Sequence, residues 1–158
     1  LLLALKEILK KEKNVRLLIV GADNFGGKYI ELAKELEIAE QVDFPGHRDD
    51  ACDLVHISDI AVGSSLREGL PVNVMEALAC GLPVILSDNR GHRALCKNGY
   101  NGYVVMPNDY EAMAQKTLSL LTDGKLYSEM SENAAEFVKP YAKENVIVEL
   151  KEIYEKYM

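Results

Sequence analysis

The sequence predicts an α/β domain built on a Rossmann-like parallel sheet, and two observations support this prediction. Short, nearly continuous apolar runs alternate with amphipathic segments over residues 15–106, as expected for buried parallel strands joined by helices. A chain of 158 residues, 48% of them hydrophobic and 27% charged, has the composition of a globular domain. A domain of this length can bury roughly 70% of its unfolded surface.

The elements follow from the spacing of the apolar residues. A first helix covers residues 1–9, because leucines and an isoleucine recur there at helical spacing. The predicted strands are residues 15–20, 42–44, 59–63, 83–86 and 103–105. The predicted helices between them are residues 29–36, 50–57, 71–80 and 92–96. Pro71 stands in the first turn of its helix, where a missing N–H costs nothing.

After residue 106 the alternation stops and helices alone are predicted. Asn108 with Glu111 resembles a capping box and predicts a helix that runs to about residue 121. Two further helices follow, separated near residues 139–140, and the last one carries an apolar stripe formed by Val146, Leu150, Ile153 and Tyr157. We therefore expect a Rossmann-like domain over residues 1–122, with helices of residues 123–158 packing on it.

Charge and cysteine content exclude several classes of protein. The net charge of −7 argues against a nucleic-acid partner. No apolar run approaches the roughly 20 residues of a membrane span, and no signal peptide is visible. Cys52, Cys80 and Cys96 are too widely spaced for a disulfide framework or a zinc motif, which indicates a reducing cytoplasm. Because residues 1–9 resemble the middle of a helix without a cap or a starting Met, we expect a piece of a longer protein.

The glycine-rich segment of residues 21–28 suggests a phosphate-binding loop but lacks two of its parts. Gly27 stands where that motif requires Lys, and Tyr29 follows Lys28 where a metal-binding hydroxyl is needed. We interpret the segment as a turn between a strand and a helix.

The segment of residues 64–76 joins the carboxyl end of a predicted strand to the start of a helix. Ligands of open parallel sheets bind outside the carboxyl ends of the strands. The amides of residues 72–74 have no intrahelical partner, so they can face an anion, and the helix dipole favours negative charge there. Gly69 permits close approach of the backbone to a ligand.

Two carboxylates flank this predicted anion site. Glu68 precedes the helix, and Glu76 lies roughly 7.5 Å along its axis from Pro71, at 1.5 Å per residue. Carboxylates accept hydrogen bonds strongly, so the pair could hold hydroxyl groups at the two ends of a sugar-phosphate ligand. From spacing alone, solvated surface acids explain the two residues equally well.

The two glutamates and their neighbours resemble a family signature. The segment of residues 65–88, Ser-Leu-Arg-Glu-Gly-Leu-Pro-Val-Asn-Val-Met-Glu-Ala-Leu-Ala-Cys-Gly-Leu-Pro-Val-Ile-Leu-Ser-Asp, is similar to the motif of the group 1 (family 4) retaining glycosyltransferases. Residues 42–50 and 99–105 resemble neighbouring family segments. Residues 89–93 resemble the form of the next turn in capsule and exopolysaccharide enzymes. The match covers about residues 15–122 in the family's order.

The resemblance implies the C-terminal, donor-binding domain of a two-domain GT-B hexosyltransferase. By that analogy Glu68 contacts the donor sugar and is the candidate catalytic residue, while Glu76 holds the ribose hydroxyls. The other implied contacts are Gly69, Leu70 and Val72 near the diphosphate and Gly46, His47 and Arg48 near the base. The resemblance also implies that neither a metal nor another cofactor is needed, because enzymes of this kind are typically metal-independent. Its mechanism implies electrostatic stabilisation of a departing diphosphate and of an oxocarbenium-like sugar.

Two departures from the family pattern are visible. The first strand and its basic loop are not in this sequence. In the order 3-2-1-4-5-6 that strand is central, so we expect a gap or repacking. Ala94 replaces an acid that often follows the turn of residues 89–93.

The resemblance, together with these departures, predicts the partners of the protein. The implied partners are a nucleotide-diphosphate sugar and an N-terminal acceptor domain outside this sequence. Without that domain and the basic loop, we predict that this chain alone does not transfer sugar. The resemblance implies a cytoplasmic enzyme with peripheral membrane contact, since such acceptors are often lipid-linked. The alternatives are a non-catalytic nucleotide-sugar binding domain and a sugar-nucleotide epimerase of the same architecture, which would need a general acid/base pair.

Overall fold

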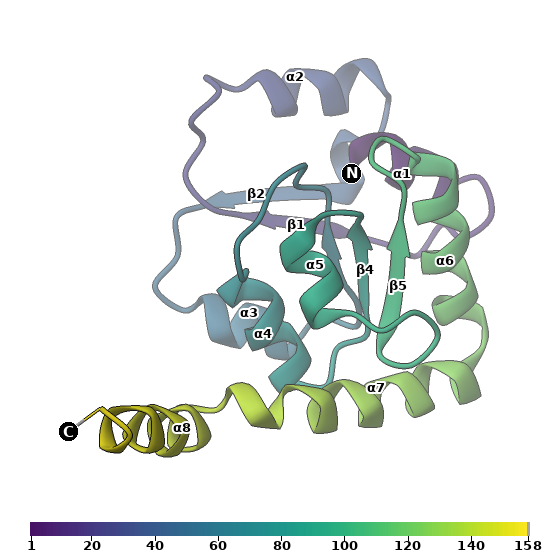
Figure 1. The fold of residues 1–158 in the computed structure, drawn as a ribbon. Helices are drawn as coiled ribbons and strands as arrows, with labels where there is room; N and C mark the ends of the chain where they lie inside the picture. Colours follow the sequence, from purple (N-terminus) through teal and green to yellow (C-terminus); the bar gives the residue numbers. More distant parts are fainter. Residues whose placement is uncertain (158) are drawn as a thin grey trace.

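The computed structural model describes residues 1–157 as parallel strands flanked by helices (Figure 1). The strands are β1 (Leu17–Val20), β2 (Val42–Gly46), β3 (Ala61–Gly63), β4 (Val84–Ser87) and β5 (Gly102–Val105). The α-helices are α1 (Leu2–Ile8), α2 (Lys28–Glu35), α3 (Ala51–His56), α4 (Val72–Ala79), α5 (Arg90–Leu95), α6 (Tyr110–Thr122), α7 (Gly124–Val138) and α8 (Lys143–Glu155). Two short 3₁₀ helices are η1 (Ala39–Gln41) and η2 (Lys139–Tyr141). The predicted order of strands and helices is confirmed.

The strands form two parallel sheets rather than one. β1 pairs with β2, and β3, β4 and β5 pair in that order. The interruption falls between β1 and β3, which is where the order 3-2-1-4-5-6 led us to expect a gap. α1 joins the two parts, because Leu2 and Leu5 pack in the core beside β2 whereas Ala4 and Ile8 pack against β4 and α6. The predicted gap is therefore confirmed.

β4 is the centre of the main core. All four of its residues are buried. Val84 and Leu86 pack with residues of α4, α5 and α7, whereas Ile85 packs on the other side with residues of α1 and α6. Successive side chains of a strand point to opposite faces, so a strand covered on both faces is apolar throughout. This explains the continuous apolar run that identified the strand.

The start and the buried face of α4 differ from expectation. Pro71 is the N-cap, with extended φ and ψ of −73° and 114°, and the helix begins one residue later. The apolar residues 72, 75 and 79 recur at helical spacing and so predict the buried face of this helix, but this prediction is wrong because Val72 is 60% exposed. The buried residues of α4 are Val74, Ala77 and Leu78, because this face meets β4 and α7.

The predicted caps in the C-terminal part also need correction. Asp109, not Asn108, caps α6, since its carboxylate accepts a hydrogen bond from the Ala112 amide at 2.8 Å. Asn108 instead has a left-handed backbone, with a φ of 65°. Asp123 caps α7, so Gly124 begins this helix. Polar side chains with a free carboxylate satisfy the first amides of both helices.

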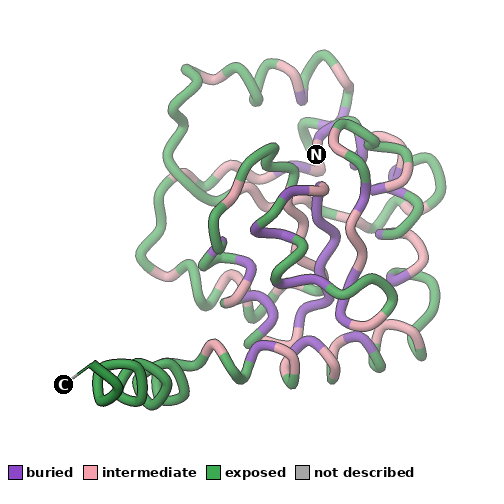
Figure 2. Tube along the Cα trace, viewed as in Figure 1, coloured by how far each residue is buried: buried purple, intermediate pink, exposed green. Residues whose placement is uncertain are grey.

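The two last helices differ in how they meet the rest of the chain. α7 lies along α4 and buries Met130, Ala134 and Val138. α8 has no buried residue, and it extends away from the body of the molecule (Figures 1 and 2). The predicted packing is therefore found for α7 and not for α8. The apolar stripe is exposed, from 39% at Val146 to 50% at Ile153 on α8 and 86% at Tyr157 just after the helix.

None of the helices in residues 1–157 is both long enough and apolar enough to cross a membrane.

The three thiols should react at very different rates. Cys52 is exposed, and burial raises the pKa of the Cys96 thiol from 9.0 to about 12. Burial, with smaller contributions from Cys52 and Glu76, also raises the pKa of Cys80. Because the thiolate is the reactive form, iodoacetamide at pH 8 should label Cys52 first and Cys96 only on unfolding. Mass spectrometry of the labelled protein measures the order, and rapid native labelling of Cys96 would contradict it.

Candidate functional site

The loop between β3 and α4 and the turn between β4 and α5 enclose a pocket of about 670 Å³. Both segments leave the carboxyl ends of neighbouring parallel strands, where open α/β sheets bind ligands. The pocket is lined by Leu66, Arg67, Glu68, Gly69, Asn89 and Arg90. The segment singled out from the sequence thus forms one wall, and a second segment 20 residues later in the chain forms the other.

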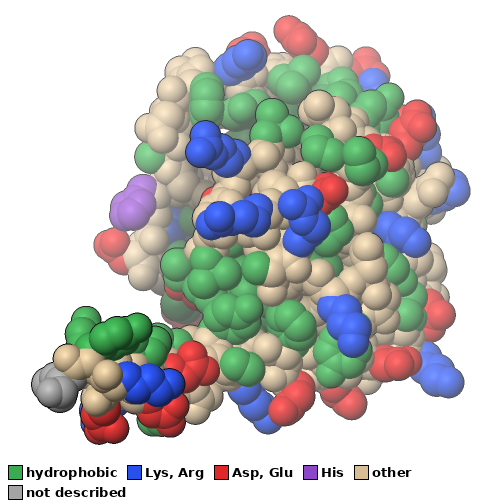
Figure 3. All heavy atoms as spheres, viewed as in Figure 1, with side chains coloured by type: hydrophobic (Ala, Val, Ile, Leu, Met, Phe, Trp, Pro, Cys, Tyr) green, Lys and Arg blue, Asp and Glu red, His purple; other side chains and the backbone are tan. Residues whose placement is uncertain are grey.

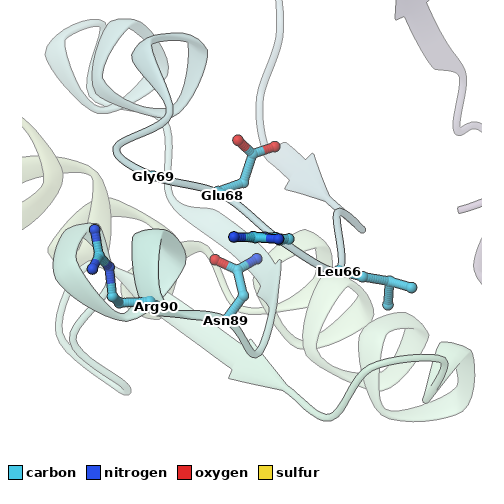
Figure 4. A pocket seen from close by; sticks show the side chains of 6 residues that line it. Leu66, Glu68, Gly69, Asn89 and Arg90 are labelled. Carbon is cyan, nitrogen blue, oxygen red and sulfur yellow. The ribbon is translucent and has the colours of Figure 1, made fainter.

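The side chains of the pocket point in different directions (Figure 4). The Asn89 amide points toward the loop that carries Glu68. The Glu68 carboxylate and the Arg90 guanidinium extend away from Asn89 on different sides. Glu68 is half-buried, Arg90 is exposed and Asn89 is 7% exposed. Asn89 therefore belongs to the floor of the pocket, while the two charged groups remain accessible to a ligand.

The pocket carries positive charge in an otherwise acidic protein. Arg16, Arg48 and Arg93 are each paired with an aspartate. Over residues 1–157, Arg67 and Arg90 have no carboxylate within ion-pair distance, and both line the pocket. Basic side chains gather near the middle of the face shown in Figure 3. Unpaired guanidinium groups in a hollow attract an anionic ligand and can bind it in a bidentate manner.

The start of α4 offers further donors to an anion. Met75 is the first residue of this helix whose amide bonds a preceding carbonyl, that of Pro71 at 3.3 Å. In the described chain the amides of residues 72–74 donate no hydrogen bond. The helix dipole places partial positive charge at these amides. The predicted anion site at the start of α4 is thus geometrically available.

Glu68 and Gly69 are the predicted site residues that line the pocket. Leu70, Val72 and Glu76 follow in the chain but lie outside its lining, and all three are exposed. Glu76 stands on α4 one turn after the free amides. The assignment of these residues to substrate remains a prediction.

The three residues predicted to line a base lie at the end of β2, away from the pocket lining. Arg48 donates to both carboxylate oxygens of Asp50, with its Nε at 2.7 Å, and this hydrogen bond lowers the pKa of Asp50. His47 lies 3.7 Å from a carboxylate oxygen of Asp49, and both side chains are exposed. Gly46 has a left-handed φ of 74°. Arg48 would have to leave Asp50 before it could bind a ligand with its full charge.

Sequence reasoning missed Asn89 as a pocket residue. From the sequence, Arg67 and Arg90 fit a local positive charge and solvated surface side chains equally well. The available signal was the position of Asn89, two residues after a fully buried strand that neighbours β3. Carboxyl ends of adjacent parallel strands meet at one edge, so polar residues that follow them come together.

The glycine-rich turn of residues 21–28 is not arranged to bind phosphate. The Asp23 carboxylate accepts hydrogen bonds from the amides of Phe25, at 2.9 Å, and Gly27. An acid that occupies the amides also repels an anion, which agrees with our interpretation of a plain turn.

Metal ligands do not gather in the part of the chain that the structure describes. No group of three or more His, Cys, Asp or Glu side chains there could hold a metal ion.

Comparison with known proteins gives one consistent result. The family model "Glycosyl transferases group 1" matches residues 1–137. The chain is 32% identical over 152 residues to the glycosyltransferase EpsD of Bacillus subtilis (strain 168), covering 95% of this chain and 40% of that protein. The chain therefore spans less than half the length of this relative.

Solved structures agree with this result. A glycosyltransferase from Rickettsia africae superposes with a TM-score of 0.89 at 27% identity, covering 99% of this chain and 43% of that one. HepE from Anabaena, solved in complex with UDP and glucose, superposes with a TM-score of 0.84 at 22% identity, covering 99% and 43%. The predicted fold, a Rossmann-like domain of the GT-B type, is confirmed.

Proposed function

The chain belongs to the group 1 glycosyltransferase family, and from this membership we propose that it binds the nucleotide-diphosphate sugar in a retaining hexosyltransferase. The observation that carries the proposal is the position of Glu68. It lines a pocket at the carboxyl ends of two parallel strands, next to the free amides of α4 and two unpaired guanidinium groups. The form of residues 89–93 supports a role in bacterial capsule or exopolysaccharide synthesis.

The chemistry of the pocket suits each part of such a donor. The diphosphate would lie at the amides of residues 72–74, where the helix dipole and Arg67 favour negative charge. The Glu68 carboxylate would accept hydrogen bonds from hydroxyls of the sugar. A sugar that gains positive charge in the transition state is stabilised by a nearby carboxylate, and a leaving diphosphate by fixed donors.

The nucleoside would extend from the start of α4 toward the end of β2. Glu76 would accept hydrogen bonds from the ribose hydroxyls, and residues 46–48 would line the base. The complex of HepE with UDP and glucose supports a nucleoside diphosphate as the ligand class.

The rest of the enzyme would supply the acceptor. This chain spans 40% of EpsD, so we propose that an N-terminal acceptor domain completes the active site and that this chain alone does not transfer sugar. The complete enzyme would act in the cytoplasm with peripheral contact to the membrane, where lipid-linked acceptors are found.

The two alternatives make different demands on the pocket. An epimerase needs a general acid and a base, yet Glu68 is the one carboxylate or imidazole side chain among the described residues that line the pocket. A non-catalytic binding domain would bind the same donor without transfer. We therefore retain the transferase, and substitution of Glu68 distinguishes it from a non-catalytic binding domain.

Substitution of Glu76 tests the nucleotide site. Glu76→Gln should weaken the binding of a nucleoside diphosphate about 10-fold. A neutral amide oxygen would then replace the carboxylate that accepts hydrogen bonds from the two ribose hydroxyls. Calorimetric titration with UDP, ADP and GDP measures the affinity and identifies the base. Glu132→Gln, on the exposed side of α7, is the matched control and should bind as the parent does. If the Glu76 and Glu132 variants bound the nucleoside diphosphate with equal affinity, Glu76 would not belong to the nucleotide site.

A further inference from the structure

We propose that the turn of residues 87–92 is a positioning element that fixes Glu68, and that Gly91 sets the distance between them. The inference rests on the proposed function, because it concerns how the Glu68 carboxylate is held toward the donor sugar. Neither Ser87 nor Gly91 lines the pocket, so an effect of either residue must reach the ligand through its neighbours.

Two buried side chains of this turn hold the loop that carries Glu68. The carbonyl of Ser65, three residues before Glu68, accepts hydrogen bonds from the Ser87 hydroxyl at 2.5 Å and from the Asn89 amide at 2.9 Å. A carbonyl oxygen has two lone pairs, and both are used here. Ser87 and Asn89 are 3% and 7% exposed, so both donors are held in the protein interior, whereas Ser65 itself lies at the surface. The direction of the loop after β3 is thus fixed at Ser65.

The same turn is braced from behind by His92. The Asn89 side-chain oxygen accepts a hydrogen bond from the His92 amide at 2.9 Å and caps α5. The His92 ring is 2% exposed and its Nδ1 lies 2.6 Å from the Ser87 carbonyl oxygen. The ring also packs against Gly63 at the end of β3, where a Cβ atom would lie 3.4 Å from it. The two side chains that donate hydrogen bonds to the Ser65 carbonyl therefore cannot shift independently of α5 and β3.

Gly91 brings α5 closer to the Glu68 loop than any other residue would allow. A Cβ atom at residue 91 would lie 2.6 Å from the Gly69 carbonyl oxygen, 2.8 Å from Glu68 Cβ and 3.0 Å from the Glu68 carbonyl carbon. These are backbone atoms or the first side-chain atom, so no rotamer change relieves the overlap. The shortest of these distances is about 0.8 Å below the 3.4 Å at which ordinary contact begins.

A methyl group at residue 91 should therefore displace the Glu68–Gly69 peptide. A misplacement of about 1 Å in a catalytic group can cost about 100-fold in rate. The start of α4, where we place the diphosphate, is held separately by the burial of Val74 and Leu78 against β4 and α7. Transfer should thus suffer much more than nucleotide binding.

The test is Gly91→Ala in the full-length enzyme. We expect kcat for sugar transfer to fall about 10- to 100-fold, while the Kd of the nucleoside diphosphate rises less than about 5-fold, because the Gly69 amide that the resemblance places near the diphosphate moves with the displaced peptide. Gly124→Ala is the matched control, because a Cβ atom there meets nothing within 4 Å and its φ is not left-handed. Unchanged kcat in the Gly91 variant would overturn the proposal.

A double-mutant cycle separates positioning from simple loss of stability. In a Glu68→Gln background, Gly91→Ala should lower kcat by less than about 2-fold further, because the group that it displaces is already neutralised. Losses that multiply would show that Gly91 acts independently of Glu68, and would overturn the inference. Full transfer by Glu68→Gln alone would instead overturn the proposed function.

Ser87→Ala provides a second variant if Gly91→Ala does not fold. It removes one of the two hydrogen bonds to Ser65 without adding an atom. We expect a smaller fall in kcat, about 3- to 10-fold, with unchanged nucleotide affinity and with the same non-additivity toward Glu68→Gln. A parent-like kcat in this variant would overturn the proposal.

Discussion

Replacement of Glu68 by Gln is expected to lower sugar transfer by about 100- to 1000-fold, while the affinity for the nucleoside diphosphate stays nearly unchanged. Gln keeps the size of the side chain and removes the negative charge that would face the developing oxocarbenium ion. Glu68 is the acid that lines the pocket, so no other carboxylate among the lining residues can take its place. The loss should appear in kcat, because the charge acts mainly in the transition state.

The measurement needs the full-length enzyme, a nucleotide-sugar donor and an acceptor, with calorimetric titration of the nucleoside diphosphate in parallel. Glu132→Gln serves again as the control for loss of an exposed acid. Transfer at the parent rate by the Glu68 variant would exclude the proposed role. A parent protein that binds the nucleotide but transfers no sugar to any acceptor would establish the binding domain instead.

Gly102→Ala is expected to lower the free energy of unfolding by about 3 kcal/mol or more. Gly102 begins β5 and pairs with Val84, which is fully buried in the central strand β4. A Cβ atom at residue 102 would lie 2.0 Å from the Val84 carbonyl oxygen and 2.8 Å from its Cγ2. Relief of this overlap requires β5 to move away from β4, which breaks ladder hydrogen bonds and opens the core on both faces.

Urea denaturation followed by circular dichroism measures this change. Gly124→Ala at the start of α7 is again the control, since its Cβ atom has free space and Ala is the better helix former. The control should be within about 0.5 kcal/mol of the parent, or more stable. A decrease of less than about 1 kcal/mol in the free energy of unfolding of Gly102→Ala would contradict this prediction, because it would show that β5 can move without disrupting the core.

Deprotonation of Cys96 should make the free energy of unfolding of the protein depend on pH. Its pKa is raised by burial to about 12, from 9.0 in the unfolded chain. Below pH 9 both states hold the proton. Between about pH 9 and 12 only the unfolded chain releases it, so the free energy of unfolding falls as the pH rises through that window.

The place of the split in the sheet followed from the family resemblance, whereas the sequence by itself determined the order of strands and helices and one wall of the site. These features depend on local signals: β4 reads as continuous apolar sequence because it is covered on both faces, and Glu68 follows a strand and precedes a helix in a single segment. The spacing of apolar residues involves only residues close together in the chain, so it predicts a strand or a helix without knowledge of the fold.

Only the tertiary structure decided which face of α4 is buried, that α8 leaves the body, and how Asn89 and Gly91 meet the Glu68 loop. The face of α4 depends on where α7 lies, and α7 begins 45 residues after α4 ends. The approach of Gly91 to Gly69 depends on the register of β3 and β4, which brings the ends of two strands together. Contacts between distant segments arise from such register and crossover geometry, and no pattern of adjacent residues encodes them.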